Sequence, residues 1–167
     1  GANAPPPVET TPILDGKLLA KTNSFTDTLA CVDHLVTSGW FAADRVGLEG
    51  GSAGGLLVGA VLNLAPERFR VVHAAVPFVD ALTTMLQPDL PLTVGEWEEW
   101  GNPLADPQVY AAMRAYAPYE NVRAAAYPAV LATSSLHDTR VYVTEPAKWV
   151  ARLREVVTND PQTRPIL

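Results

Sequence analysis

The sequence is poor in the residues that form covalent or metal-based cross-links. Its single cysteine, Cys31, cannot form a disulfide within the chain, and we expect it to pack as a small apolar side chain. Only three histidines are present, and no group of histidines and cysteines has the spacing of metal ligands. The sequence therefore excludes a disulfide scaffold and predicts neither a metal nor another cofactor.

Long apolar runs and an excess of basic charge are also missing. No run of apolar residues approaches the length that spans a bilayer, and the N-terminus has neither the basic start nor the apolar core of a signal peptide. Acidic residues outnumber basic ones by 18 to 12, which argues against nucleic acids and acidic membranes as partners. We expect a cytoplasmic protein that has no nucleic-acid or membrane partner.

The composition that remains is typical of a globular protein, because 48% of the residues are apolar and 18% are charged. The exception is residues 1–14, where three consecutive prolines and the lack of hydrophobic periodicity indicate a linker or an atypical N-terminal segment. We therefore place the folded region at residues 15–167.

Short apolar runs alternate with amphipathic segments along residues 15–167. Runs that are apolar throughout are typical of strands in a parallel sheet with helices on both faces, so the predicted fold class is α/β with a mostly parallel sheet. We predict strands at 46–49, 71–76 and 128–133, a fourth strand that begins at 165, and helices from Ser24 to near Gly39, at 56–62, at 109–116 and from Thr144 to Val157.

The most informative segment is residues 46–62, where a predicted strand leads through Gly-Gly-Ser-Ala-Gly-Gly into a predicted helix. Strand, G-x-S-x-G and helix together are the context of a nucleophile elbow, which holds its serine in a strained turn. Gly50 and Gly54 would let the strand and helix approach closely, and Ser52 would be the nucleophile. A glycine-rich phosphate loop is the alternative, but no Gly-Lys-Ser/Thr follows.

A serine nucleophile needs a base and an acid that orients the base. Asp138 follows the third predicted strand and is therefore placed to be the acid, although it could also be an aspartate in a surface turn. None of the three histidines fits as the base: we expect His34 to be a solvated or half-buried helix residue, His73 a hydrogen-bonded core residue and His137 too close to Asp138 in sequence. The triad is incomplete in this chain.

Six stretches of the sequence resemble those of a known protein family. They are 15–19, 23–27, 49–55, 76–80, the acid- and tryptophan-rich block 91–103, and 145–150. On these stretches the chain resembles the oligopeptidase B branch of the prolyl oligopeptidase family of serine peptidases. The resemblance implies that residues 15–167 are part of an α/β-hydrolase catalytic domain, which in this family is accompanied by a β-propeller.

The resemblance also implies roles for individual residues. Ser52 becomes the nucleophile, the Ala53 amide an oxyanion donor, Asp138 the triad acid and Arg140 a residue that holds the substrate backbone. Glu96 and Glu98 match the acidic positions that recognise an arginine or lysine before the scissile bond, with Glu96 the better candidate. The residues themselves leave alternatives open. Glu96-Trp97-Glu98 could be an exposed edge segment, and Arg140 could form a surface ion pair. Trp97 and Trp100 could line the pocket or belong to the core.

The function implied is a serine endopeptidase that hydrolyses short peptides with basic residues through an acyl-enzyme. We expect the family's histidine and propeller, and further sheet strands, to lie outside these 167 residues, and the chain alone to be inactive. Two alternatives remain. An esterase or lipase would share the elbow without needing Glu96 and Glu98, and a non-catalytic module would keep the elbow for packing or binding.

Overall fold

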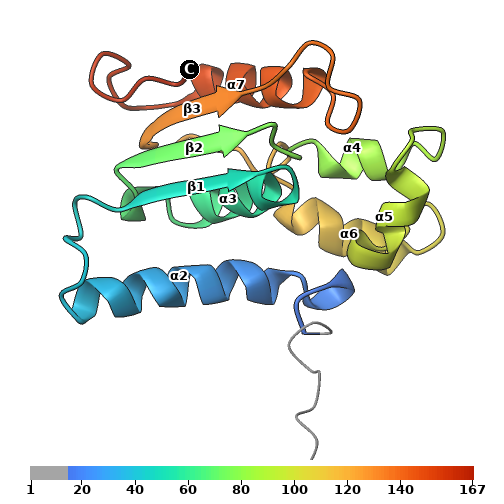
Figure 1. The fold of residues 1–167 in the computed structure, drawn as a ribbon, viewed down its shortest axis with the longest axis horizontal. Helices are drawn as coiled ribbons and strands as arrows, with labels where there is room; N and C mark the ends of the chain where they lie inside the picture. Colours follow the sequence, from blue (N-terminus) through green and yellow to red (C-terminus); the bar gives the residue numbers. More distant parts are fainter. Residues whose placement is uncertain (1–14) are drawn as a thin grey trace, which may run out of the picture.

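A three-stranded parallel sheet forms the centre of the computed structural model, which describes residues 15–167 (Figure 1). β1 (Gly47–Gly51), β2 (Val71–Ala75) and β3 (Ala129–Thr133) lie in the spatial order β1-β2-β3 and end in register at the same edge. The predicted α/β class and parallel sheet are confirmed. The segment 1–14, which we predicted to be a linker, lies outside the described residues.

The end of the chain begins a fourth parallel strand beside β3, as the sequence predicted. Ile166 forms a parallel bridge with Val130, and the N–H of Leu167 donates to the carbonyl of Val130 at 2.8 Å. The N–H of Ala132 in turn donates to the carbonyl of Leu167 at 2.8 Å.

Helical segments connect and cover the strands. α3 follows β1 directly and buries Val58, Val61 and Leu62 completely, because almost every side chain along it is apolar. None of the helices in residues 15–167 is long and apolar enough to cross a membrane. The helical segments are η1 (Leu18–Ala20), α2 (Thr22–Thr37), α3 (Ala53–Leu64), η2 (Pro66–Arg68), α4 (Ala81–Met85), α5 (Thr93–Trp100), α6 (Pro107–Tyr116) and α7 (Thr144–Val156).

The first long helix begins earlier than predicted. α2 starts at Thr22, so Ser24 lies inside it and is not its N-cap. The preceding turn η1 leads straight into α2, and the Ser24 hydroxyl donates to the carbonyl of Gly16 at 3.4 Å. The helix ends as expected, with Gly39 just beyond it at a φ of +76°.

The two faces of the sheet differ in burial. Val72, Ala74 and Val130 lie in the core on the face that α3 covers, and the strands lie in front of α3 in Figure 1. We expected helices on both faces, but within residues 15–167 the other face is open and Leu131 on it is 43% exposed. The strands are therefore not buried on both faces, which their apolar sequences had suggested.

His73 lies on this open face and not in the core, where we had placed it. Its Nδ1 lies 3.0 Å from Glu49 Oε1, and its Nε2 lies 3.1 Å from Thr133 Oγ1. The three side chains come from the three strands, so they form a polar row across the sheet. The expectation of a hydrogen-bonded His73 is correct, but the expected burial is wrong.

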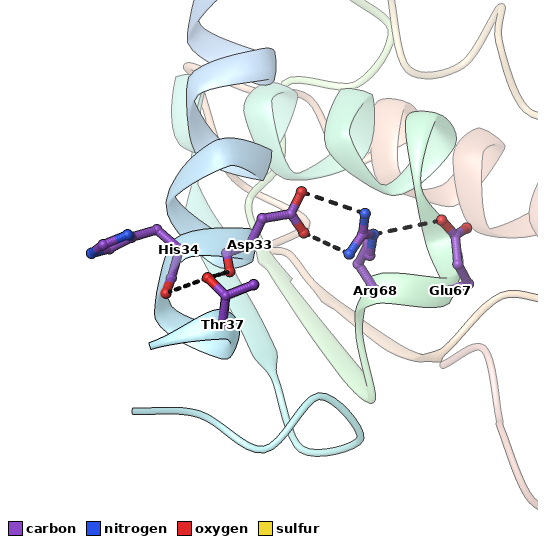
Figure 2. Close-up of polar contacts among 5 residues, drawn as sticks. All are labelled: Asp33, His34, Thr37, Glu67 and Arg68. Atoms are coloured by element: carbon purple, nitrogen blue, oxygen red, sulfur yellow. Dashed lines mark hydrogen bonds and ion pairs between the residues drawn. The ribbon is translucent and has the colours of Figure 1, made fainter. Parts of the chain in front are cut away.

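Polar contacts attach α2 to η2, just before the start of β2. The Arg68 guanidinium pairs with the Asp33 carboxylate and lies 3.9 Å from Glu67, while Thr37 donates to backbone carbonyls of α2 (Figure 2). The exposed His34 ring points away from this cluster, so of the two positions expected for it, solvated or half-buried, the structure has the solvated one.

Candidate active site

Ser52 lies at the turn between β1 and α3, with φ +53° and ψ −121°. This is a strained conformation for a residue with a side chain, as the elbow motif predicted. Backbone hydrogen bonds hold it there. The Ser52 N–H donates to the carbonyl of Ala75 at 3.0 Å, and its carbonyl accepts from the N–H groups of Gly55 at 2.9 Å and Phe78 at 3.0 Å.

Close approach around this turn requires glycine at positions 50 and 55. A Cβ at Gly50 would lie 2.5 Å from the carbonyl oxygen of Gly54, and a Cβ at Gly55 would lie 2.5 Å from Cα of Pro77. A Cβ at Gly54 would meet nothing within 4 Å. The predicted need for glycine at position 50 is therefore confirmed. The second glycine that close packing requires is Gly55 and not Gly54, the residue that we had predicted from the motif.

The amide groups beside Ser52 suit an oxyanion. Ala53 is the first residue of α3, and the first N–H groups of a helix have no acceptor within it. They also lie at the positive end of the helix dipole. A developing negative charge next to Ser52 would therefore meet the Ala53 N–H, which is the role predicted for it.

A pocket opens beside Ser52. The β1–α3 turn contributes Ser52 and Ala53, helix α5 contributes Glu96, and the loop after β3 contributes Arg140. Most of the remaining lining is apolar and includes Phe78, Met85 and Leu92. The predicted nucleophile, oxyanion donor, acidic residue and arginine are thus brought together from three distant segments.

The two predicted acidic positions diverge because residues 93–100 form a helix and not an edge segment. Residues two apart on a helix point in different directions, so Glu96 lines the pocket while Glu98 is exposed and is not part of the lining. The half-buried Glu96 accepts a hydrogen bond from the Trp100 indole N–H at 2.8 Å. Trp100 therefore orients Glu96 from the core and does not line this pocket.

Trp97 also belongs to the packing of α5. Its side chain is half-buried against the core, and its indole N–H donates to the carbonyl of Met85 at 3.2 Å. Of our two interpretations for Trp97 and Trp100, the core interpretation fits the structure.

Asp138 lies in the loop that follows β3, at the same sheet edge as Ser52. Its Oδ1 accepts from the backbone N–H groups of Arg140 at 2.8 Å and Val141 at 3.0 Å. These bonds, with help from the Arg140 charge, lower the pKa of the Asp138 carboxyl below its ordinary value. The residue therefore stays ionised at neutral pH, and Oδ2 accepts no hydrogen bond from residues 15–167.

The Arg140 side chain is exposed at the pocket. It forms no ion pair with another residue of the described region, so the surface ion pair that we considered is not seen. Its charge is available to a ligand.

No histidine ring bonds to Ser52 or Asp138 within residues 15–167. His34 lies on α2, His73 bonds to Glu49 and Thr133, and His137 is exposed beside Asp138. No cluster in the described region could hold a metal ion either. The geometry therefore contains a nucleophile and an acid at one rim, without a base from these residues.

One pocket residue was missed at the sequence level as a functional candidate. Glu145 in the first turn of α7 lines the pocket but is only 4% exposed. A glutamate near a helix start ordinarily stabilises the helix dipole at the surface, so the sequence carried no signal for burial.

Comparison with known proteins gives a consistent result. Residues 14–164 match the family model described as Prolyl oligopeptidase family. Dipeptidyl aminopeptidase BI of Pseudoxanthomonas mexicana is 52% identical over 144 residues, which cover 86% of this chain and 20% of that protein. Protease 2 of Moraxella lacunata is 50% identical over 146 residues, which cover 87% of this chain and 21% of that protein.

Solved structures agree. Oligopeptidase B from Trypanosoma brucei, in a closed form with covalently bound antipain, superposes with a TM-score of 0.85 and 51% sequence identity. The match covers 88% of this chain and 21% of that structure. The chain thus spans about a fifth of the length of the relatives it matches.

Proposed function

Because the chain belongs to the prolyl oligopeptidase family, and within it is oligopeptidase B-like, we propose that it carries the nucleophile of a serine endopeptidase that cleaves short peptides after arginine or lysine. The observation that carries this proposal is the single pocket that Ser52 and Glu96 line together. In this proposal the scissile carbonyl would lie next to Ser52, and the preceding basic side chain would lie next to Glu96.

The proposed reaction follows the serine-hydrolase sequence. Ser52 Oγ attacks the carbonyl carbon, its proton passes to an imidazole, and the Ala53 N–H stabilises the oxyanion. The amine then leaves with that proton, and water releases the acyl group from Ser52. Asp138 orients the imidazole, which we propose comes from outside residues 1–167 because His34, His73 and His137 all lie elsewhere.

Glu96 suits an arginine more than a neutral side chain. A half-buried carboxylate whose orientation is fixed by Trp100 can form two parallel hydrogen bonds with a guanidinium, and pairs less specifically with an ammonium. Arg140 would hold the backbone of the same peptide. Glu98 had been predicted to share the role of Glu96, but its exposed position favours Glu96 alone.

The same proposal extends to the rest of the enzyme. The relatives are about five times as long as their match to this chain, which leaves room for a β-propeller and further sheet strands. By the family resemblance we propose that such a propeller admits only short peptides, and that the enzyme is cytoplasmic.

The test uses the complete polypeptide that carries these residues, with blocked arginyl and neutral peptide substrates and simple esters. Ser52→Ala should abolish turnover and labelling by a fluorophosphonate. Glu96→Gln should lower kcat/KM for the arginyl peptide roughly 10–100-fold, in the range of a charged hydrogen bond, and leave the neutral peptide unchanged. Glu98→Gln is the matched control and should change neither value strongly.

Other results would favour other functions. Equal loss on arginyl and neutral substrates with Glu96→Gln, or turnover of esters alone, would favour an esterase or lipase. The relative named Dipeptidyl aminopeptidase BI supplies a second candidate, release of dipeptides from a free N-terminus. Cleavage only of unblocked peptides would support it.

A further inference from the structure

The pocket beside Ser52 contains a second carboxylate besides Glu96. Glu145 comes from α7, lines the same pocket and is 4% exposed, so it is more deeply buried than the half-buried Glu96. A carboxylate at this depth loses most of its hydration, which is costly unless other groups compensate for its charge.

The contacts of Glu145 satisfy its hydrogen bonds but not its charge. Oε1 accepts from the Thr84 hydroxyl at 2.7 Å, and Oε2 accepts from the Asp80 N–H at 2.9 Å. Both donors are neutral. The nearby Lys148 ammonium pairs with the Asp80 carboxylate, and no basic side chain of residues 15–167 forms an ion pair with Glu145.

A purely structural clamp would not need this charge. A glutamine could accept from the Asp80 N–H through its carbonyl and donate to the Thr84 oxygen through its amide, because a hydroxyl can accept as well as donate. It would avoid the cost of a buried ion. A cation that enters the pocket would compensate for this charge.

We propose that Glu145 is a specificity-determining residue, a second carboxylate that joins Glu96 in attracting the basic side chain of the substrate into the pocket. This inference rests on the proposed function. Glu96 and Glu145 belong to different elements, α5 and α7, so a guanidinium or ammonium in the pocket would meet negative charge from both.

The surroundings of Glu145 make its charge sensitive to pH near neutrality. Burial raises its pKa to about 7, with a further increase from the Asp80 charge, while the bonds from the Asp80 N–H and the Thr84 hydroxyl oppose the rise. The charged or titratable groups around it are Asp80 at the N-cap of α4, Glu96 on α5, Arg140 and Tyr142 in the β3–α7 loop, and Lys148 on α7.

Linkage then fixes the direction of the effect. A cation that binds better to ionised Glu145 must lower the pKa of Glu145, and deprotonation must strengthen binding of the cation by the same factor. The preference for an arginyl over a neutral substrate should therefore rise as the pH increases through about 7. Taking the ratio of the two kcat/KM values cancels the titration of the catalytic base.

The experiment measures this ratio from pH 5.5 to 8.5 in the complete polypeptide, for wild type and Glu145→Gln. At pH 8 the substitution should raise KM for the arginyl peptide roughly tenfold, the effect of one pKa unit of coupling, and should raise KM for the neutral peptide much less, so that the ratio of the two kcat/KM values falls. The pH-dependent rise of the ratio should disappear.

A second variant tests the same idea without removing the charge. Thr84→Val deletes one hydrogen bond that lowers the pKa of Glu145, so the midpoint of the rise should move to higher pH. This variant keeps the carboxylate and nearly the same side-chain volume.

The possible failures can be told apart. If wild type shows no arginyl preference, the proposed function fails before any variant is made. If Glu96→Gln removes the preference while folded Glu145→Gln leaves both KM and the pH profile unchanged, only the present inference is overturned. If Glu145→Gln raises KM equally for the arginyl and the neutral peptide, Glu145 has only a structural role, and this result also overturns the inference. If Glu145→Gln does not fold, a wild-type ratio that stays constant across pH 7 overturns it.

Discussion

Glycine at position 50 is required by the backbone that follows it. The carbonyl of Gly54 and the Val58 side chain occupy the space that a Cβ at Gly50 would need. By contrast, Gly54 has open space on its Cβ side, although the two glycines flank Ser52 symmetrically in the sequence.

This asymmetry predicts opposite effects of two alanine substitutions on stability. Gly50→Ala should lower the free energy of unfolding by roughly 1–3 kcal/mol or more, because strand and helix must separate. Gly54→Ala should be neutral or stabilising by up to about 1 kcal/mol, since alanine favours the helix. Urea denaturation of the 167-residue chain measures both, and equal losses would contradict the packing described here.

The sequence predicted the residues whose roles depend on local pattern. Ser52 and the Ala53 amide follow from strand, turn and helix in continuous sequence, and the structure reproduces that elbow. Glu96 and Glu98 could not be separated beforehand, because alternating glutamates fit either an edge strand or a helix. Glu145 was missed because its burial depends on packing against α4, which is distant in sequence.

At the scale of elements, α5 is the helix whose position decides where Glu96 points. Lys21, which is 7% exposed before α2, pairs with Glu99 of α5 and places its ammonium 4.6 Å from the centre of the Trp100 ring. Trp100 in turn donates to Glu96. The start of α2 therefore supports the pocket through α5.

The loss of stability on breaking the Lys21–Glu99 ion pair should depend on which partner is replaced. Glu99→Gln leaves the buried Lys21 ammonium with a neutral acceptor and an aromatic face but without a counter-charge, and should cost roughly 1–3 kcal/mol of stability. Lys21→Met leaves a carboxylate that is 44% exposed and can be hydrated, so the loss should be below about 1 kcal/mol. Thermal unfolding of both single variants and of the double variant checks the order, and a costlier Lys21→Met would contradict it.

The elements themselves were predictable to different degrees. The strands and α3 were predicted from continuous apolar runs, and α2 and α7 from apolar residues at helical spacing. These elements and α6 are present in the structure. The open face of the sheet was not foreseen, because a five-residue strand with one charged residue, such as Glu49 in β1, does not reveal which side helices cover.

At the scale of the whole molecule, buried carboxyls tie stability to pH. Burial raises the pKa of both Glu145 and Glu120, so the folded state binds protons that the unfolded state releases. The contribution of Glu145 to the stability of the folded state is fully present below pH 4.5, the pKa of this carboxyl in the unfolded chain. It declines as the pH rises towards about 7, the pKa in the folded state. The effect of Asp138 on stability has the opposite dependence on pH, because its pKa is lower in the folded state than in the unfolded chain. Asp138 therefore favours the folded state above pH 3.8, and this effect is lost as the pH falls.

The expected contribution of Glu145 is about 3 kcal/mol, at about 1.4 kcal/mol for each pKa unit. Glu145→Gln should therefore be more stable than wild type at pH 8 by up to this amount, and the difference should shrink towards pH 4.5. Measuring both proteins at each pH removes the contribution of all other groups. A difference that does not vary with pH would show that Glu145 titrates normally.

The open face of the sheet predicts how the 167-residue chain behaves alone. Val71 and Leu131 are 48% and 43% exposed on neighbouring strands, so the chain should bind a hydrophobic dye and associate as its concentration rises. Changing Leu131 to Ser should reduce dye binding with little loss of stability, whereas Leu153→Ser, at a completely buried position, should unfold the chain. Dye fluorescence and light scattering provide the measurement, and undiminished dye binding by Leu131→Ser would contradict it.

The parallel order of β1, β2 and β3 has a consequence for protein synthesis. Ser52 leaves the ribosome well before Arg140 and Glu145, yet these residues meet only when β3 has paired with β2. A growing chain thus exposes the Ser52 hydroxyl without the walls that would hold a peptide against it. Under the proposed function, hydrolysis begins only late in translation, and neighbouring unfinished chains are spared.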